Sequence, residues 1–389
     1  MKKTSIILAI TLFALTGCGE QRQAGNDDFI TADVTKRYSP RRELILQDFM
    51  DVEYIPLETK DDFLNQGFVQ DIGKEIILVK NRNDDGDIFV YDRTGKALRK
   101  INRKGQGGEE YTHVFNITLD EDKGEMFVSD IYKRKIFVYD LYGNFKRSFN
   151  HKEGDGSIFY VDIFDYDGDH LICYDPYNET IPFVLISKQD GSITEEIKIP
   201  FKEKKLLQQS LRDGEKHLTV SPGPHRTVIP FQGKWMLSEL SSDTVYALLP
   251  DYSLRPFLVR TPSIQSMDPE VFLLLRFFSD RYYFMETRKN VYDFDIQEGF
   301  PATFFMYDRQ EKAFSGYIIY NGDYSTKKEI YMNALRPMNH EIESWQPLEA
   351  HRLVESYENG ELKGRLKDIT AGLDEESNPV IMLVKHKKN

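Results

Sequence analysis

The sequence predicts an all-β protein in which four-stranded antiparallel sheets repeat around a ring, and three observations support this prediction. Glycines recur at an interval of 48 residues, at Gly95, Gly143 and Gly191. Short runs of aromatic and β-branched residues lie around these glycines, separated by Gly, Asp and Asn, as is typical of strands joined by tight turns. A single sheet of this kind cannot bury its own apolar faces, so neighbouring sheets must stack. A four-stranded repeat of this length predicts the blade of a β-propeller.

The N-terminus has the features of a bacterial lipoprotein signal peptide. A basic start at Lys2 and Lys3 precedes an apolar stretch over residues 5–15, and residues 15–18 (LTGC) resemble a lipobox. The apolar stretch is too short to span a bilayer, which takes about 20 residues. We expect residues 1–17 to be removed and Cys18 to be lipidated. The alternative is an ordinary signal peptide with an incidental cysteine.

The segment after the cysteine predicts how the protein is attached. Gly19, rather than Asp, follows Cys18, and by resemblance to sorted lipoproteins this favours the outer membrane. Residues 18–43 are polar and predict a flexible tether, so the folded domain is expected over residues 44–389. Whether the domain faces the periplasm or the outside is left open.

The clearest repeat unit runs from His113 to Phe149. Its four expected strands cover residues 114–119, 125–130, 135–140 and 145–149. The same order of strands and turns precedes this unit, at 75–80, 88–92 and 96–101, and follows it, at 170–174, 182–187 and 192–199. These three units predict three consecutive blades.

Later units are less regular, and they set the number of blades. The expected strands are 235–239, 244–249 and 254–260 in a fourth blade, and 282–287, 302–308 and 314–320 in a fifth. A sixth has a helical stretch at 348–357 before a last strand at 379–386, and one of its strands is missing. We expect Asp51–Leu57 to supply it and so to close the ring, which removes exposed sheet edges. Six blades are favoured, and the chain length also allows seven.

Two segments resemble a known family. Residues 103–111 (RKGQGGEEY), followed by an apolar strand and IFVYD, and residues 373–380 (LDEESNPV) are similar to the six-bladed β-propeller lipoproteins of Bacteroidetes, which are related to NHL-repeat propellers. One departure is Gly108, where that family often has proline. The resemblance implies a propeller in the cell envelope, and it implies no agreed biochemical activity.

Composition and motifs exclude several kinds of function. With 51 basic and 63 acidic side chains and a net charge of −12, the chain lacks the basic excess that nucleic-acid binding needs. Two cysteines exclude a disulfide scaffold and a four-cysteine zinc site. Four local patterns fail as functional motifs: residues 105–110 as a dinucleotide loop, 340–344 as a zinc-protease helix, 165–169 as an EF-hand loop, and Cys173 as a nucleophile. Trp235 is expected in the core, and the place of Trp345 is open. We expect no metal and no cofactor.

Propeller topology predicts where a ligand would bind. Long polar loops join the second and third strands of a blade, and others join consecutive blades, all on one face, whereas the opposite face carries short turns. Loops on a rigid scaffold commonly carry binding residues. The candidate ligand-binding residues are Gln106, Glu110, Tyr111, Tyr132, Arg134, Tyr177 and Arg226.

Two classes of function remain. The first is a non-catalytic binding or scaffold lipoprotein that presents this face to a glycan, a peptide or an envelope protein. The second is a carbohydrate-active hydrolase or lyase of the envelope that uses carboxylates or a Tyr/His pair at the mouth of the channel. The missing catalytic signatures favour binding, although an all-β scaffold can carry catalysis without a sequence motif.

Lipidation is testable in cells. Replacing Cys18 with alanine removes the acylated thiol, and with it the buried acyl chains that hold the protein on the membrane. We expect Cys18→Ala to move from the membrane fraction to the soluble fraction, as measured by immunoblotting after ultracentrifugation. Unchanged fractionation would contradict the lipobox assignment.

Overall fold

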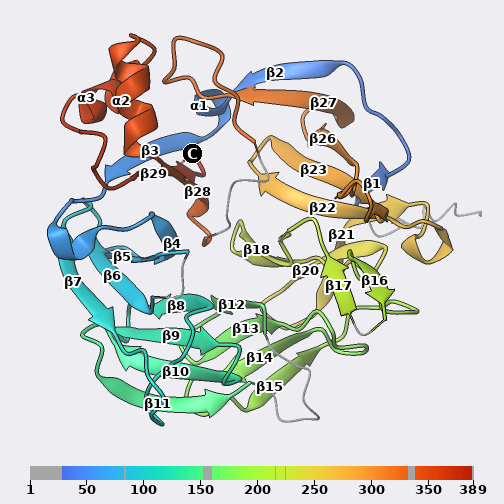
Figure 1. Ribbon diagram of the computed structural model, residues 1–389. Helices are drawn as coiled ribbons and strands as arrows, with labels where there is room; N and C mark the ends of the chain where they lie inside the picture. The colour runs from blue at the N-terminus through green and yellow to red at the C-terminus, as the bar shows by residue number, and fades with distance from the viewer. Residues whose placement is uncertain are drawn as a thin grey trace, which may run out of the picture.

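The computed structural model describes residues 29–82, 85–151, 160–214, 216–223, 225–331 and 338–387. Six sheets lie around a central axis as the blades of a β-propeller (Figure 1). The six-bladed all-β fold predicted from the repeat is therefore confirmed.

The first three blades are the regular ones. Blade one consists of β4 (Phe68–Ile72), β5 (Ile76–Lys80), β6 (Asp87–Asp92) and β7 (Ala97–Asn102). Blade two consists of β8 (Asn116–Asp120), β9 (Glu125–Asp130), β10 (Lys135–Asp140) and β11 (Phe145–Asn150). Blade three consists of β12 (Asp162–Asp165), β13 (His170–Tyr174), β14 (Phe183–Ser187) and β15 (Ile193–Ile197). Each is an antiparallel meander in chain order, as expected.

The last three blades take additional strands from the N-terminus. Blade four has β18 (Val228–Phe231), β19 (Lys234–Leu237), β20 (Thr244–Leu248) and β21 (Leu254–Thr261). Blade five has β22 (Val271–Phe278), β23 (Tyr282–Lys289), β26 (Ala302–Asp308) and β27 (Ala313–Tyr320). Blade six has β28 (Ile342–Leu348) and β29 (Val380–Lys385). Three short N-terminal strands pair with their outer edges: β1 (Ile30–Asp33) with β21, β2 (Arg41–Ile45) with β27, and β3 (Asp51–Pro56) with β29.

These N-terminal strands confirm one expectation and correct another. The antiparallel pairing of β3 with β29 closes the ring as predicted. The flexible tether expected over residues 18–43 is wrong for β1 and for the start of β2, which pair in parallel with blades four and five. The reason is that an outer strand offers unpaired backbone groups, and Ala32 and Val34 also enter the core between these blades. Residues 18–28 lie outside the described part of the chain.

The two faces of the ring differ. We call the face with the first-to-second and third-to-fourth strand connections the turn face, and the opposite one the loop face. The loop face carries the hairpin of β16 (Gln209–Asp213) and β17 (Lys216–Val220), the hairpin of β24 (Tyr292–Asp293) and β25 (Glu298–Gly299), and helices α2 (Ala350–Glu358) and α3 (Gly364–Thr370). The helix expected near 348–357 is therefore present. Two 3-10 turns (Asp61–Phe63, Ile264–Ser266) and α1 (Leu46–Phe49) complete the described elements.

Most of the core consists of separate apolar clusters, one at each junction between neighbouring blades. Because side chains alternate along a strand, Ile77 and Val79 of β5 pack toward blade six, while Leu78 packs toward blade two. Cys173 is fully buried between blades two and three, as its apolar strand predicted. Trp235 is core between blades three and four, and Trp345, left open by the sequence, is core between blades six and one.

The glycines with a period of 48 residues lie where each blade meets the one before it. Gly95, Gly143 and Gly191 all have positive φ, at 87°, 84° and 74°. A Cβ at Gly143 would lie 2.7 Å from Ile101 of β7. A Cβ at Gly95 would likewise be too close to β3, and one at Gly191 too close to β11. Each glycine therefore allows a left-handed turn and a close approach to the outer strand of the previous blade. That Gly95 meets β3 identifies β3 as the outermost strand of blade six.

This double requirement predicts that Gly143→Ala is destabilising. The strained backbone and the contact with Ile101 should together lower the free energy of unfolding by about 1–3 kcal/mol. Urea unfolding followed by tryptophan fluorescence measures the change. Gly168→Ala is the matched control, because Gly168 lies in a turn with open space around its Cβ position and no positive φ. Equal stabilities of the two variants would contradict the assignment.

Candidate functional site

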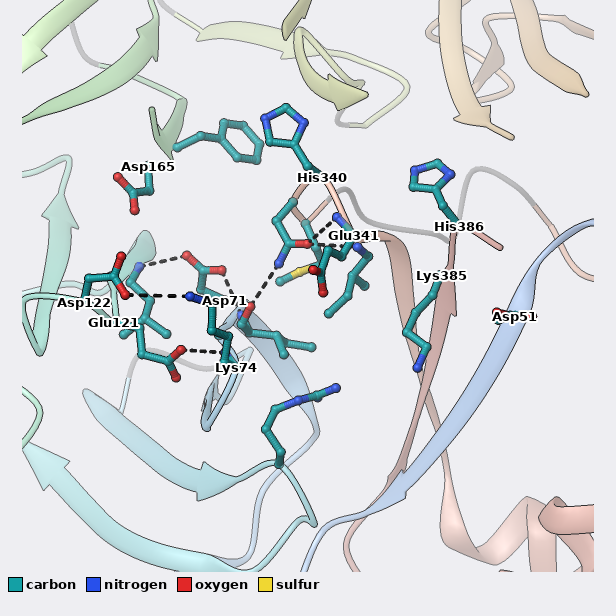
Figure 2. Close-up of a pocket in the computed structure, with 18 of the residues that line it drawn as sticks. Asp51, Asp71, Lys74, Glu121, Asp122, Asp165, His340, Glu341, Lys385 and His386 are labelled. Atoms are coloured by element: carbon teal, nitrogen blue, oxygen red, sulfur yellow. Dashed lines mark hydrogen bonds and ion pairs between the residues drawn. The ribbon is translucent and has the colours of Figure 1, made fainter. Parts of the chain in front are cut away.

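A cavity of about 1000 Å³ opens on the turn face, where the inner strands β4, β8 and β12 end (Figure 2). Its walls come from five blades. The turns after these three strands, the start of β19, the turn before β28 and the end of β29 all contribute side chains. We call it the turn-face cavity.

Carboxylates from blades one to three line one side of the turn-face cavity. Asp71 accepts the backbone N–H of Leu119 at 2.8 Å, so it joins the inner strands of blades one and two. Glu121 accepts three backbone N–H groups, from residues 74–76, at 2.6–2.9 Å. Asp165 forms an ion pair with the buried Lys188 at 2.7 Å. The blade junctions thus hold these carboxylates in place, and Figure 2 shows them on the same side of the cavity.

Two of these carboxyl groups have perturbed acidity. Burial, together with the negative charges of Asp165 and Glu121, raises the pKa of Asp71 to about 7. Burial also raises the pKa of Asp165, and the ion pair with Lys188 only partly opposes this effect. Near neutral pH, Asp71 therefore holds a proton part of the time.

The opposite side of the cavity carries imidazoles and a lysine from blade six. His340 lies in the turn before β28, and His386 follows β29, with its Nε2 3.4 Å from the Glu343 carboxylate. Lys385 pairs with Glu53 at 2.8 Å. Burial and the nearby His386 lower the pKa of His340. Figure 2 shows His340, His386 and Lys385 across the cavity from Asp71 and Asp165. The charge is not cleanly separated, because Lys74 and Arg93 of blade one and Asp51 and Glu341 of blade six also line the cavity.

The aromatic part of the wall is rigid. Tyr166 stacks on Trp235 at 5.8 Å, and His340 meets the same indole edge-on at 4.9 Å. Phe164 packs against Trp235 as well, at 6.0 Å. Trp235 therefore contributes apolar surface to the cavity but offers no uncovered ring face on which a sugar could stack.

The candidate residues predicted from the sequence lie elsewhere, and none lines the turn-face cavity. Tyr111 and Arg226 correct the prediction, because both are buried: the Tyr111 hydroxyl donates to the carbonyl of Gly86 at 2.7 Å, and Arg226 pairs with Glu343 across the channel. The Tyr111 hydroxyl and the Arg226 guanidinium therefore each have a partner within the protein.

The other candidates lie in loops of the loop face. Lys133 joins two of these loops by donating to the carbonyls of Gly107 at 3.0 Å and Glu110 at 2.6 Å. Tyr132 is 73% exposed beside them. Gln106, Arg134 and Tyr177 are also exposed. A ligand role for these five residues stays a prediction.

Sequence reasoning missed the residues of the turn-face cavity. Asp165, the last residue of β12, enters the sequence analysis only within a failed EF-hand pattern, and His340 only within a failed zinc-protease pattern. Turns after inner strands meet only when the ring closes, so nothing local in the sequence marks them as neighbours. Within the described ranges, no group of three or more His, Cys, Asp or Glu could hold a metal ion, and no helix is both long and apolar enough to cross a bilayer.

Comparisons with known proteins concern the fold. A family model described as a domain of unknown function (DUF4934) matches residues 29–385. A Bacteroides fragilis structure described as an exported protein is similar, with 15% identity, a TM-score of 0.55, and coverage of 92% of this chain and 99% of that chain. A Bacteroides vulgatus member of the DUF4221 family has 10% identity and a TM-score of 0.49, with coverage of 87% and 97%. No curated protein matches the chain in sequence.

The raised pKa of Asp71 predicts how the stability of the folded protein depends on pH. Its folded pKa of about 7 lies above the ordinary value of 3.8, so the folded state binds this proton more tightly than the unfolded state. The contribution of Asp71 to stability is therefore complete below pH 3.8 and lost as the pH rises toward 7. As the pH rises from 4.5 to 7.5, the free energy of unfolding of Asp71→Asn should increase by roughly 1–3 kcal/mol relative to that of wild type.

Urea unfolding at several pH values measures this difference. Asp122→Asn is the control, because its side chain lines the same cavity but is 91% exposed. A pH-independent difference between wild type and Asp71→Asn would show that the carboxyl group is ionised throughout this range.

Proposed function

The chain belongs to the DUF4934 family, and we propose that it is a cell-envelope lipoprotein that binds a charged, peptide-like ligand in the turn-face cavity. The observation that carries this proposal is the contrast between the two sides of one cavity: carboxylates from blades one to three face the imidazoles of His340 and His386 from blade six. A ligand with an amino group for the carboxylates and a hydrogen-bond acceptor, such as a peptide carboxylate, for the imidazoles complements both sides.

The size and lining of the cavity favour a small ligand. A volume of about 1000 Å³ is at the upper end of the range for small-molecule sites, whereas protein interfaces are broad and flat. Ile72, Leu119 and Phe164 supply apolar surface for an aliphatic or aromatic side chain. The covered faces of Trp235 favour a peptide over a neutral glycan.

The envelope location rests on two supports. The first is the signal peptide and lipobox at residues 1–18, which lie outside the described ranges. The second is the structurally similar protein from Bacteroides fragilis, which is described as exported. A lipid anchor at Cys18 would hold the folded domain at a membrane of the envelope.

A second candidate function is hydrolysis at the same cavity. One observation favours it: Asp71 has a pKa raised to about 7, while His340 has a lowered one, and both line the cavity. A carboxyl group and an imidazole with shifted acidities can act as a general acid and a general base.

Binding is tested with the chain from residue 26 onward, which keeps every described residue. Calorimetry against short zwitterionic peptides and against neutral oligosaccharides should give binding only for peptides. His340→Ala should weaken peptide binding about tenfold, because the variant loses part of the cavity wall and a hydrogen-bonding imidazole. Tyr132→Ala, on the loop face, is the matched control and should leave affinity unchanged.

The opposite pattern, with affinity lost only in Tyr132→Ala, would place the ligand on the loop face and contradict the proposal. Oligosaccharide binding without peptide binding would contradict the ligand class. Mass spectrometry of the same mixtures distinguishes the two functions: cleaved peptide that disappears with Asp71→Asn would establish hydrolysis.

A further inference from the structure

The loop face carries a second hollow, independent of the turn-face cavity. It lies between the β16–β17 hairpin and the β24–β25 hairpin, where the Gln209 side chain donates to the carbonyl of Asn290 at 2.9 Å. Its volume is about 890 Å³. We call it the hairpin groove, and its apolar lining consists of Leu211, Val291, Tyr292, Phe294, Ile296 and Pro301.

Large apolar side chains at the hairpin groove are exposed to solvent. Ile296 is 65% exposed, and the cross-strand pair Leu211 and Leu218 is 43% and 53% exposed. Only Val220 and Tyr292 from these two hairpins pack against the nearest buried cluster. A two-stranded hairpin is only marginally stable in water, so keeping leucines on its exposed surface has a cost in stability and solubility. Contiguous apolar surface of this kind marks an interaction site.

The β24–β25 side of the hairpin groove forms an acidic rim. Asp293, Asp295 and Glu298 are exposed, and residues 290–307 contain no Lys, Arg or His, whereas the β16–β17 hairpin carries the exposed Arg212, Lys216 and His217. In the described part of the chain, none of the three carboxylates forms an ion pair. The Asp293 side chain accepts the backbone N–H of Asp295 at 2.9 Å, which holds the loop without neutralising its charge.

We propose that the hairpin groove binds a short segment of another protein that carries apolar and basic side chains. Its apolar side chains replace water against Leu211, Phe294 and Ile296, and its Lys or Arg side chains pair with the acidic rim. This charge complementarity favours a basic segment over an acidic one. The groove lies on the face opposite the turn-face cavity, so the inference does not depend on the ligand proposed there.

The test uses a fluorescein-labelled decapeptide of alternating Leu and Lys, and the same peptide with Glu in place of Lys. Fluorescence anisotropy measures binding at 150 mM salt. Removing the rim charge with D293N, D295N and E298Q together should weaken binding of the Leu/Lys peptide about tenfold. The matched control removes three exposed acidic groups elsewhere, with E196Q, E375Q and E376Q, and should change affinity less than twofold.

A second pair of variants tests how much the apolar contacts of the groove contribute to peptide binding. Ile296→Ser should weaken binding of the Leu/Lys peptide severalfold, whereas Leu64→Ser, at a residue that is 56% exposed away from the groove, should not. Circular dichroism verifies that each variant is folded, and thermal unfolding shows whether its stability is kept.

Three outcomes would overturn the proposal. Equal weakening by the two triple variants would mean that the peptide responds to net charge rather than to the groove. Equal binding of the Leu/Glu peptide would remove the charge complementarity. Light scattering that finds a dimer, dissociated by Ile296→Ser, would show that the occupant is a second copy of this chain.

Discussion

Each blade has two apolar faces and can bury them only against its neighbours. This constraint explains the distribution of the core, which is divided into clusters between successive blades rather than gathered at one centre. A row of such sheets would end in two uncovered apolar faces. Closing the row into a ring buries both faces, because the last blade covers the first.

Closure depends on the N-terminal segment. Blade six would lack its outermost strand without β3. Ile55 of β3 and the following Leu57 pack together with β29 and with blade one. Upstream, β1 and β2 extend the outer edges of blades four and five. The segment between residues 30 and 56 therefore ties the last three blades together from outside, and the end of the ring is held by residues far away in the sequence.

Ring closure also creates the turn-face cavity. Asp71 and Asp165 belong to different blades, and they face the same cavity because the inner strands of the ring converge on one axis. Their raised pKa values follow from this convergence, since burial and like charge are both properties of the assembled ring. The same geometry brings His340, from the last blade, opposite carboxylates that lie some 200 residues earlier.

The two faces of the ring have different chemical characters. Turns hold the carboxylates of the turn face by backbone hydrogen bonds, as the three amides around Glu121 illustrate. The loop face instead carries insertions, among which the two hairpins leave Leu211 and Ile296 in solvent. A cavity with both charged and apolar walls suits a small ligand, and an open apolar groove suits a flexible segment of a protein.

The sequence by itself determined the class of fold and the strand that closes the ring, and it favoured six blades over seven. These features depend on local signals: alternation along a strand, an aspartate before a turn, and glycines such as Gly143 that adopt positive φ. Only the tertiary structure decided which residues share a site and which expected residues are buried, as Tyr111 and Arg226 are. It also decided that β1 and β2 are strands, because their pairing partners lie more than 200 residues away. Local patterns record what each segment prefers, whereas a cavity depends on which segments the closed ring brings together.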